Sequence, residues 1–169
     1  MGYSIKSIEE IMEELHKEMV QITDISMLLD FPFPENYKEI VTKIKTVSIS
    51  TKCKLYSFAE AKEITEKYGG TNNTIKDYWF IGKRGFDYWV MDKKGKIHFW
   101  EIPEDKTIDV NINFLQWLQF AYLDKENDIV EKQLESFDET AYLQGEYIEY
   151  IAKINEISKE LKEFIYELY

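Results

Sequence analysis

The apolar residues near the start of the chain recur at the spacing of one face of an α-helix. They are Ile8, Ile11, Met12, Leu15, Met19 and Ile22, with glutamates and a lysine between them. Ser7 and Glu10 form a capping box, in which a side-chain acceptor is followed three residues later by a glutamate. The pattern predicts an amphipathic helix that begins after Ser7 and ends near residues 21–24.

Two prolines interrupt this helical pattern. Residues 31–34 read Phe-Pro-Phe-Pro, and each proline favours an extended conformation for the residue before it. Pro34 suits the first position of a helix, because the amide hydrogen that it lacks would have no partner there. We therefore predict a second, short helix from Pro34, with an inward face formed by Tyr37, Ile40, Val41 and Ile44.

Apolar and polar residues then alternate with a period of two. Residues 47–50, Val-Ser-Ile-Ser, predict a strand with one buried face, and residues 54–56 predict another short strand. Ser57 and Glu60 form a second capping box. They predict a helix that stops at the glycine pair of residues 69–70, where a left-handed residue is easily accommodated.

Residues 78–102 contain three of the four tryptophans of the chain. Their pattern predicts three strands joined by turns at residues 82–85 and 92–95, each of which ends in glycine. In the middle strand Phe86, Tyr88 and Val90 fall on one face, and Asp87, Trp89 and Met91 fall on the other. Because both faces are partly apolar, the strand is either covered on both sides or presents one face to a partner.

The last part of the chain is dominated by helical periodicity. Asn111 or Asn113 is predicted to cap a helix that carries Phe114, Leu115, Leu118, Ala121 and Tyr122. Further on, apolar residues are spaced alternately by four and three, with Ser158 in one apolar slot: Tyr147, Ile151, Ile154, Leu161, Ile165 and Leu168. Such a seam packs either on its own domain or on another chain.

These elements predict an α+β fold, in which helices flank a central, mostly antiparallel sheet and an extra helical segment follows. We place the sheet domain at residues 1–123 and a C-terminal acidic helical extension, packed on it, at residues 124–169. The chain has 169 residues and is 44% hydrophobic, which is sufficient for a buried core.

The net charge of −11 is unevenly distributed along the chain. Residues 1–123 carry 19 acids and 16 bases, a net charge of −3, whereas residues 124–169 carry 13 acids and 5 bases, a net charge of −8. Such a balance argues against nucleic acid as a partner, because phosphate binding needs clustered bases. The acidic C-terminal segment either attracts a basic partner or only solvates helix faces.

No apolar run approaches the roughly 18 residues of a membrane span, and the N-terminus lacks the pattern of a signal peptide. One cysteine, Cys53, excludes an internal disulfide, and the two histidines give no metal-binding spacing. We therefore expect a cytoplasmic protein without membrane contact, metal or cofactor.

Five short motifs occur in a characteristic order. The first is a helix start with proline and tyrosine at residues 33–40, and the second is a strand-to-helix junction at residues 55–61. The third is a strand that ends in Ile-Gly at residues 79–82, and the fourth is a hairpin with an Asp-x-x-Gly turn at residues 87–99. The fifth is the start of a closing helix at residues 112–118. In this order they resemble the SUKH superfamily, which includes the fungal cell-wall-assembly regulator and many bacterial immunity proteins. The resemblance covers roughly residues 5–123.

What the resemblance implies is a protein that binds rather than catalyses. Bacterial members of the superfamily are intracellular antidotes that bind and neutralise toxins delivered between competing cells, many of them nucleases. We therefore expect an immunity protein whose partner is a basic toxin domain, since an acidic inhibitor complements a basic cleft. The alternative is a scaffold or regulator of the cell-wall-regulator type, followed by a small-molecule-binding or enzymatic domain.

The candidate partner-binding residues lie in and just after the tryptophan-rich stretch. They are Asp87, Trp89, Asp92, Glu101, Glu104 and Asp105. Three of these carboxylates could pair for acid–base catalysis, but no nucleophile, base or oxyanion donor accompanies them, so we expect no enzyme. His98 is expected to be a sheet residue, and Trp89 is left open between core and partner surface.

Overall fold

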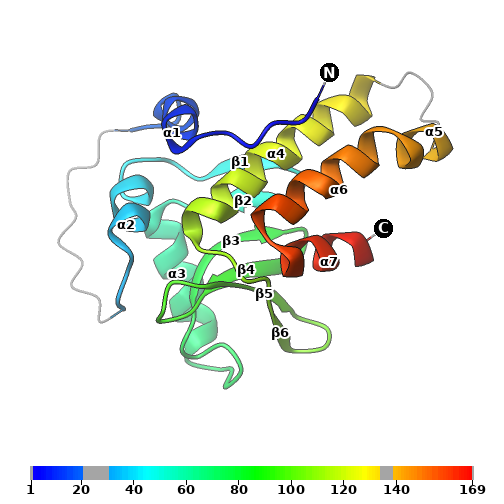
Figure 1. Ribbon diagram of the computed structural model, residues 1–169. Helices are drawn as coiled ribbons and strands as arrows, with labels where there is room; N and C mark the ends of the chain where they lie inside the picture. Colours follow the sequence, from blue (N-terminus) through cyan, green and yellow to red (C-terminus); the bar gives the residue numbers. More distant parts are fainter. Residues whose placement is uncertain (1, 21–30, 134–138, 169) are drawn as a thin grey trace.

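The computed structural model describes residues 2–20, 31–133 and 139–168, and in these residues helices cover both faces of a six-stranded antiparallel sheet (Figure 1). This arrangement confirms the predicted α+β fold. The elements are α1 (Ile8–His16), α2 (Glu35–Val41), β1 (Val47–Ser50), β2 (Cys53–Leu55), α3 (Phe58–Gly69), β3 (Trp79–Arg84), β4 (Asp87–Met91), β5 (Ile97–Glu101), β6 (Lys106–Asp109), α4 (Phe114–Gln133), α5 (Glu139–Gln144), α6 (Glu146–Ile157) and α7 (Lys159–Glu167).

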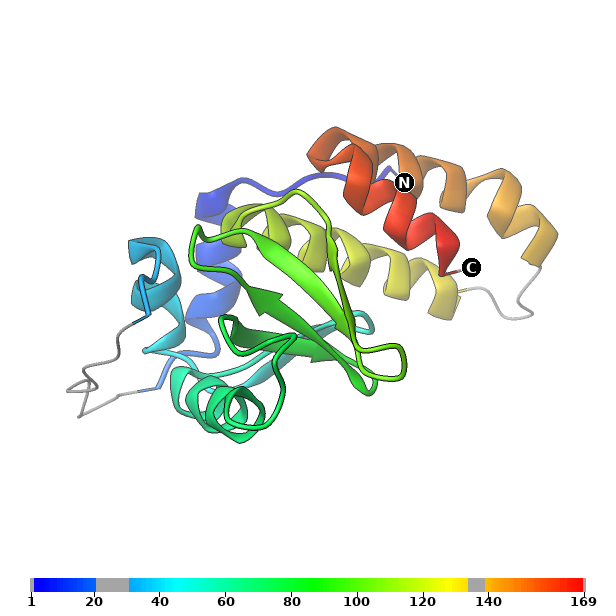
Figure 2. The same cartoon turned by 90° about the horizontal axis from the view of Figure 1, so that it is seen from below.

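The sheet is a meander whose strands lie in sequence order, each antiparallel to its neighbour. Figure 2 shows it between α3 on one side and α4, α6 and α7 on the other. Trp89 and Phe99 belong to the larger core beneath α4 and α7, whereas Phe80 and Trp100 belong to a smaller core beneath α3. Both faces of the central strands are therefore covered by the protein's own helices.

The two N-terminal helices begin close to the predicted residues. Ser7 Oγ accepts a hydrogen bond from Glu10 N at 3.2 Å, and the Glu10 carboxylate accepts one from Ser7 N at 3.1 Å, which completes the predicted capping box. Pro34 is the residue before α2 rather than its first residue. The helix α1 ends at His16, earlier than predicted, and the predicted end at residues 21–24 lies outside the described residues.

The early end of α1 has a structural reason. Val20 N donates to Lys43 O at 2.8 Å, and Lys45 N donates to Glu18 O at 3.2 Å, so the chain after α1 pairs with the segment that follows α2. Met19 and Ile44 form an isolated antiparallel bridge there. The backbone groups that would have continued the helix are used in this pairing instead.

The second capping box is completed through a third residue. Ser57 Oγ accepts from Glu60 N at 3.3 Å as predicted. Ser57 N, however, donates to Thr46 Oγ1 at 2.9 Å, and the Thr46 hydroxyl in turn donates to the Glu60 carboxylate. The start of α3 is thereby fastened to the segment that leads into β1.

The predicted turn at residues 82–85 is wrong, because β3 continues to Arg84 and the turn is formed by Gly85 and Phe86. Gly82 lies inside the strand, beside a bulge, where an added Cβ would lie 1.9 Å from Lys54 O. The glycine is therefore required by the close approach of β2 rather than by a turn. The predicted turn at residues 92–95 is confirmed, with φ of 84° at Gly95.

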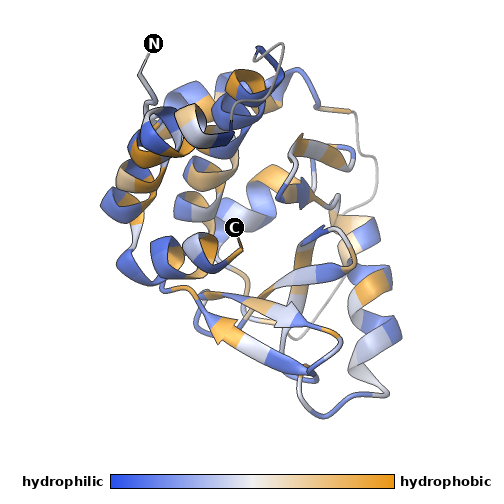
Figure 3. Cartoon of the chain, turned by 90° about the vertical axis from the view of Figure 1, so that its right-hand side faces the viewer, coloured by the Kyte–Doolittle hydropathy of each residue, from blue (hydrophilic) through white to orange (hydrophobic). Residues whose placement is uncertain are grey.

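The C-terminal helices share the core of the sheet. The helix α4, whose first amides are capped by Asn113, runs through the expected boundary between residues 123 and 124 without a break. Ser158 separates α6 from α7 and caps α7 through its hydroxyl, which explains the polar residue in the apolar seam. Hydrophilic (blue) and hydrophobic (orange) residues alternate along α6 and α7 in Figure 3, as expected for amphipathic helices.

The seam of the last two helices packs within the chain. Tyr147, Ile154, Leu161 and Ile165 are all buried in the larger core, which confirms packing on the protein's own domain. Among the described residues, none of the helices combines the length and the apolarity that a membrane span requires.

Candidate functional site

Three turns of the meander lie at the same end of the sheet. They are the β1–β2 turn (residues 51–52), the β3–β4 turn (residues 85–86) and the β5–β6 turn (residues 102–105). Alternate connections of an antiparallel meander meet at one end, so these three turns are neighbours. We call this region the turn end of the sheet.

The turn end carries a large apolar side chain that is almost fully exposed. Phe86 is 93% exposed, the highest fraction among the large apolar side chains of the described residues. It follows Gly85, whose φ of 57° is the left-handed conformation that a tight turn between β3 and β4 needs. Covering a phenylalanine side chain is worth roughly 1.5–3 kcal/mol. Phe86 is therefore a ready anchor for another molecule.

Three carboxylates belong to the turn of Phe86 and to the neighbouring β5–β6 turn. Asp87, the next residue, accepts a hydrogen bond from Ile102 N at 3.0 Å, which fastens the β3–β4 turn to the β5–β6 turn. Glu101 and Glu104 flank Ile102 and share one cation, with Lys106 Nζ at 3.7 Å and 2.9 Å respectively. The hydrogen bond to Glu104 and the charges of both glutamates raise the pKa of Lys106. We call Phe86, Asp87, Glu101, Ile102 and Glu104 the turn surface.

Asp105 belongs to the same turn but has a structural role. Its carboxylate accepts hydrogen bonds from Trp100 Nε1 at 2.9 Å, from Asn72 Nδ2 at 3.1 Å and from the Thr74 hydroxyl at 3.0 Å. These donors, the Trp100 indole first, lower the pKa of Asp105. The residue has φ of 48°, and its carboxylate holds the β5–β6 turn against the loop after α3. Its oxygens are occupied within the protein.

Asp92 lies at the opposite end of β4, in the β4–β5 turn. One oxygen accepts from the backbone amides of Lys94 and Lys96, and the other lies 2.9 Å from His98 Nε2. Partial burial raises the pKa of Asp92, but the hydrogen bonds from His98 and the two amides outweigh it and lower the pKa. Asp92 is thus separated from the turn surface by the length of a strand, roughly 17 Å.

Trp89 is a core residue, which corrects its inclusion among the candidate partner-binding residues. Its side chain is fully buried, between Phe120 of α4 and Phe164 of α7. Its indole Nε1 donates to Lys52 O at 2.8 Å. Asp87, which was predicted on the same face, lies at the exposed end of β4. Trp89 lies further along, where α4 and α7 cross this strand.

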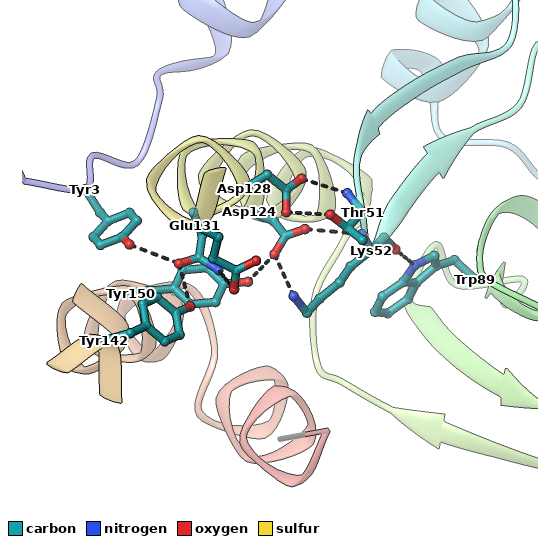
Figure 4. Close-up of polar contacts among 10 residues, drawn as sticks. Tyr3, Thr51, Lys52, Trp89, Asp124, Asp128, Glu131, Tyr142 and Tyr150 are labelled. Atoms are coloured by element: carbon teal, nitrogen blue, oxygen red, sulfur yellow. Dashed lines mark hydrogen bonds and ion pairs between the residues drawn. The ribbon is translucent and has the colours of Figure 1, made fainter. Parts of the chain in front are cut away.

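A buried ion pair lies directly behind the β1–β2 turn (Figure 4). Lys52 Nζ is 3.0 Å from Asp124 Oδ1, with exposed side-chain fractions of only 8% and 0%. The other oxygen of Asp124 accepts from Lys52 N at 3.2 Å, and the Tyr150 hydroxyl donates to the same carboxylate. The pair therefore joins the sheet, α4 and α6, and it fixes the position of the turn relative to both helices.

A second set of polar contacts extends this connection along α4. Asp128 accepts a hydrogen bond from Thr51 N at 2.8 Å and another from the Thr51 hydroxyl. Asn127 Oδ1 accepts from the hydroxyls of Tyr3 and Tyr142, at 2.9 and 2.8 Å. The N-terminal segment, the β1–β2 turn and α5 are thus all tied to one face of α4 (Figure 4).

In the part of the chain that the structure describes, the acidic and histidine side chains form no metal site and the cysteine is not an activated nucleophile. Among the described residues, no group of three or more His, Cys, Asp or Glu side chains could hold a metal ion. Cys53 is fully buried, and its burial raises the pKa of its thiol well above the ordinary value, the opposite of an activated nucleophile. His98 is paired with a turn aspartate at the sheet end opposite the turn surface.

The exposed residues at the centre of the turn surface, Phe86 and Ile102, were not among the sequence-based candidates. With the turn placed at residues 82–85, Phe86 was assigned to a strand face together with Tyr88. A useful signal was present, because Gly85 followed by an aromatic residue also fits a two-residue hairpin turn. Gly82 stays inside β3 because it packs closely against β2, and the turn is therefore formed by Gly85 and Phe86. This packing is a tertiary contact, so the local pattern of the sequence does not reveal it.

Comparison with known proteins finds no matching protein-family model, no matching curated protein and no matching solved structure. The geometry offers a rigid, exposed aromatic anchor in an acidic setting, which is suited to binding another protein.

Proposed function

We propose that this chain is a non-enzymatic binding protein of the immunity type, which acts in the cytoplasm and neutralises a basic toxin domain by holding it against the turn surface. The observation that carries the proposal is the 93% exposure of Phe86 in a turn whose neighbours are carboxylates. Interface hot spots are typically central aromatic residues surrounded by a polar rim.

The charge of the turn surface selects the class of partner. Asp87, the residue after Phe86, is joined by its hydrogen bond from Ile102 N to the turn that carries Glu101 and Glu104. The nearby cations are Lys106 and Arg84, the strand partner of Asp87. The whole chain carries a net charge of −11. A basic protein would be attracted from a distance and would find carboxylates where it docks, which raises the association rate at low salt.

The turn surface is also held rigidly before binding. The Asp87–Ile102 hydrogen bond joins its two turns, and the three hydrogen bonds to Asp105 fix the β5–β6 turn against the rest of the domain. A preorganised surface loses little conformational entropy when a partner binds. This property suits stoichiometric inhibition, which requires a long-lived complex.

The choice of a toxin as the partner rests on the resemblance of residues 33–40, 55–61, 79–82, 87–99 and 112–118 to the SUKH superfamily. The turn surface itself is compatible with any basic protein. A scaffold or regulator would use the same residues, and the nature of the partner distinguishes the two functions.

The test is co-expression with the toxin-like protein encoded by the neighbouring reading frame. The wild-type chain should restore growth and form a complex with this protein in size-exclusion chromatography. Phe86→Asp should abolish the rescue, whereas Ile148→Ala, at an exposed apolar residue of α6, should leave it intact. If the wild-type chain neither restores growth nor forms a complex, the immunity function is excluded; a neighbouring gene of another kind favours the regulator.

A further inference from the structure

The turn end of this acidic protein also borders a basic cleft. The cleft has a volume of about 660 Å³ and runs from α4 across the β1–β2 hairpin to β3. Its charged lining consists of Lys54, Lys83, Lys125, Lys132 and Asp128. Four lysines and one aspartate thus line a hollow of the size that small ligands occupy, and the ammonium group of Lys125 also lies over the Tyr122 ring, 5.8 Å from its centre.

The single carboxylate of the cleft does not neutralise these lysines. Asp128 is one helical turn from both Lys125 and Lys132, the spacing at which ion pairs form along a helix. Its two oxygens instead accept the hydrogen bonds from Thr51. Among the described residues, no carboxylate lies within 4 Å of any of the four ammonium groups.

The two lysines on the strands face each other. Lys54 of β2 and Lys83 of β3 are direct partners in the antiparallel register. Side chains at such positions are separated by only about 5 Å at Cβ, and like charges placed there destabilise a sheet. The two strands therefore bring like charges side by side. A bound anion between the two ammonium groups would remove the repulsion between them.

We infer that this cleft binds a small anion that carries several phosphate groups. Lysine ammonium groups are compact point charges suited to phosphate oxygens, and a lining that contains four lysines matches a ligand with several negative groups. The remaining lining is Ser48, Ile49, Ser50, Thr51, Gly85 and Ile129, which includes no aromatic residue on which bases could stack. A short polyphosphate therefore fits the lining better than a nucleic acid strand.

The cleft and the turn surface are separate sites on the same end of the sheet. The cleft is lined by Gly85, whereas the turn surface begins at Phe86. Anion binding does not depend on the proposed toxin binding, and either can fail without the other. A ligand in the cleft would lie next to the β3–β4 turn and would add negative charge beside the docking surface.

The test is calorimetric titration of the purified full chain with sodium tripolyphosphate at pH 7, at two salt concentrations. The expected result is saturable 1:1 binding that weakens as salt increases. The double variant Lys54→Gln/Lys83→Gln should bind at least about tenfold more weakly. A matched control, Lys153→Gln/Lys159→Gln, loses the same charge from α6 and α7 and should change the affinity less than about twofold.

Two further arms test the ligand class and the integrity of the variants. A thymidine oligonucleotide and a hexaglutamate peptide should bind more weakly than tripolyphosphate. The thermal midpoint of the unliganded strand variant should equal or exceed that of the wild type, because its repulsion is relieved. The inference is overturned if no saturable binding occurs, if both double variants lose affinity equally, or if either competing polymer binds more tightly.

Discussion

The buried ion pair between Lys52 and Asp124 predicts a large effect of a small substitution. Asp124→Asn preserves the size of the side chain but removes its charge and replaces one acceptor oxygen by a donor. In the wild-type protein, the Asp124 carboxylate accepts hydrogen bonds from Lys52 Nζ, from Lys52 N and from the Tyr150 hydroxyl. An amide cannot accept all three, so at least one donor would face another donor in a fully buried site.

The expected magnitude follows from this burial. Removing one partner of a buried ion pair costs about 3–5 kcal/mol, because a charge is left in a low-dielectric environment. We expect the lower end, about 3 kcal/mol, since the amide retains part of the hydrogen bonding. For a domain of this size, that change lowers the melting temperature by roughly 6–12 °C.

The assay is urea unfolding followed by circular dichroism, with Asp128→Asn as the matched control. Asp128 lies one helical turn after Asp124 in α4 and accepts a hydrogen bond from Thr51, which precedes Lys52 in the β1–β2 turn. Unlike Asp124, it is partly exposed. Its substitution should cost about 1 kcal/mol. The reasoning is refuted if the two variants are equally stable. Replacing both partners, as Lys52→Met/Asp124→Leu, should be less destabilising than Asp124→Asn alone.

Three other substitutions test separate parts of the fold. Gly82→Ala should destabilise the protein by about 1–3 kcal/mol in thermal unfolding, because the new Cβ would lie 1.9 Å from a backbone oxygen. The control Gly69→Ala in α3 places its Cβ in open space and should be neutral or slightly stabilising. The pKa of Asp92 is lower in the folded protein than in the unfolded chain, so its carboxylate stabilises the fold. This stabilisation is fully present above the unfolded pKa of about 3.9 and is lost as the pH falls through the folded pKa. Asp92→Asn should therefore reduce stability at pH 7 and flatten its decline between pH 5 and 3 in urea titrations. Ser158→Ala removes the cap of α7 and a 2.8 Å hydrogen bond to a buried carbonyl, and it should lower the free energy of unfolding by about 1–2 kcal/mol.

Local signals predicted the elements of the fold well. The capping serines Ser7 and Ser57, the glycine of the 92–95 turn and the asparagine before α4 are each followed by the expected structure. These signals act within four residues of the chain, so a sequence alone carries them. The apolar seam of the last helices likewise predicted buried residues.

The errors arose where a distant contact decides the outcome. The helix α1 ends early because residues 18–20 pair with residues 43–45, and Gly82 is a strand residue because the carbonyl of Lys54 approaches it.

The candidate site was predicted only in part, for the same reason. Asp87, Glu101, Glu104 and Asp105 lie together at the turn end, whereas Asp92, the remaining acidic candidate, lies at the opposite end of β4. Trp89 is buried by α4 and α7, helices that are distant in sequence. The exposure of Phe86 follows from the displaced turn. The basic cleft could not be predicted, because β2, β3 and α4 each contribute lysines that are far apart in the chain.

The most direct test of the central claim is the affinity of the purified chain for the toxin-like protein encoded beside it, measured by calorimetry for the wild type and Phe86→Ala. Loss of an aromatic anchor worth about 2 kcal/mol predicts an affinity roughly 30-fold weaker, with an unchanged melting temperature because the side chain is 93% exposed. Equal affinities for the two proteins would contradict the proposal that the turn surface is the binding site.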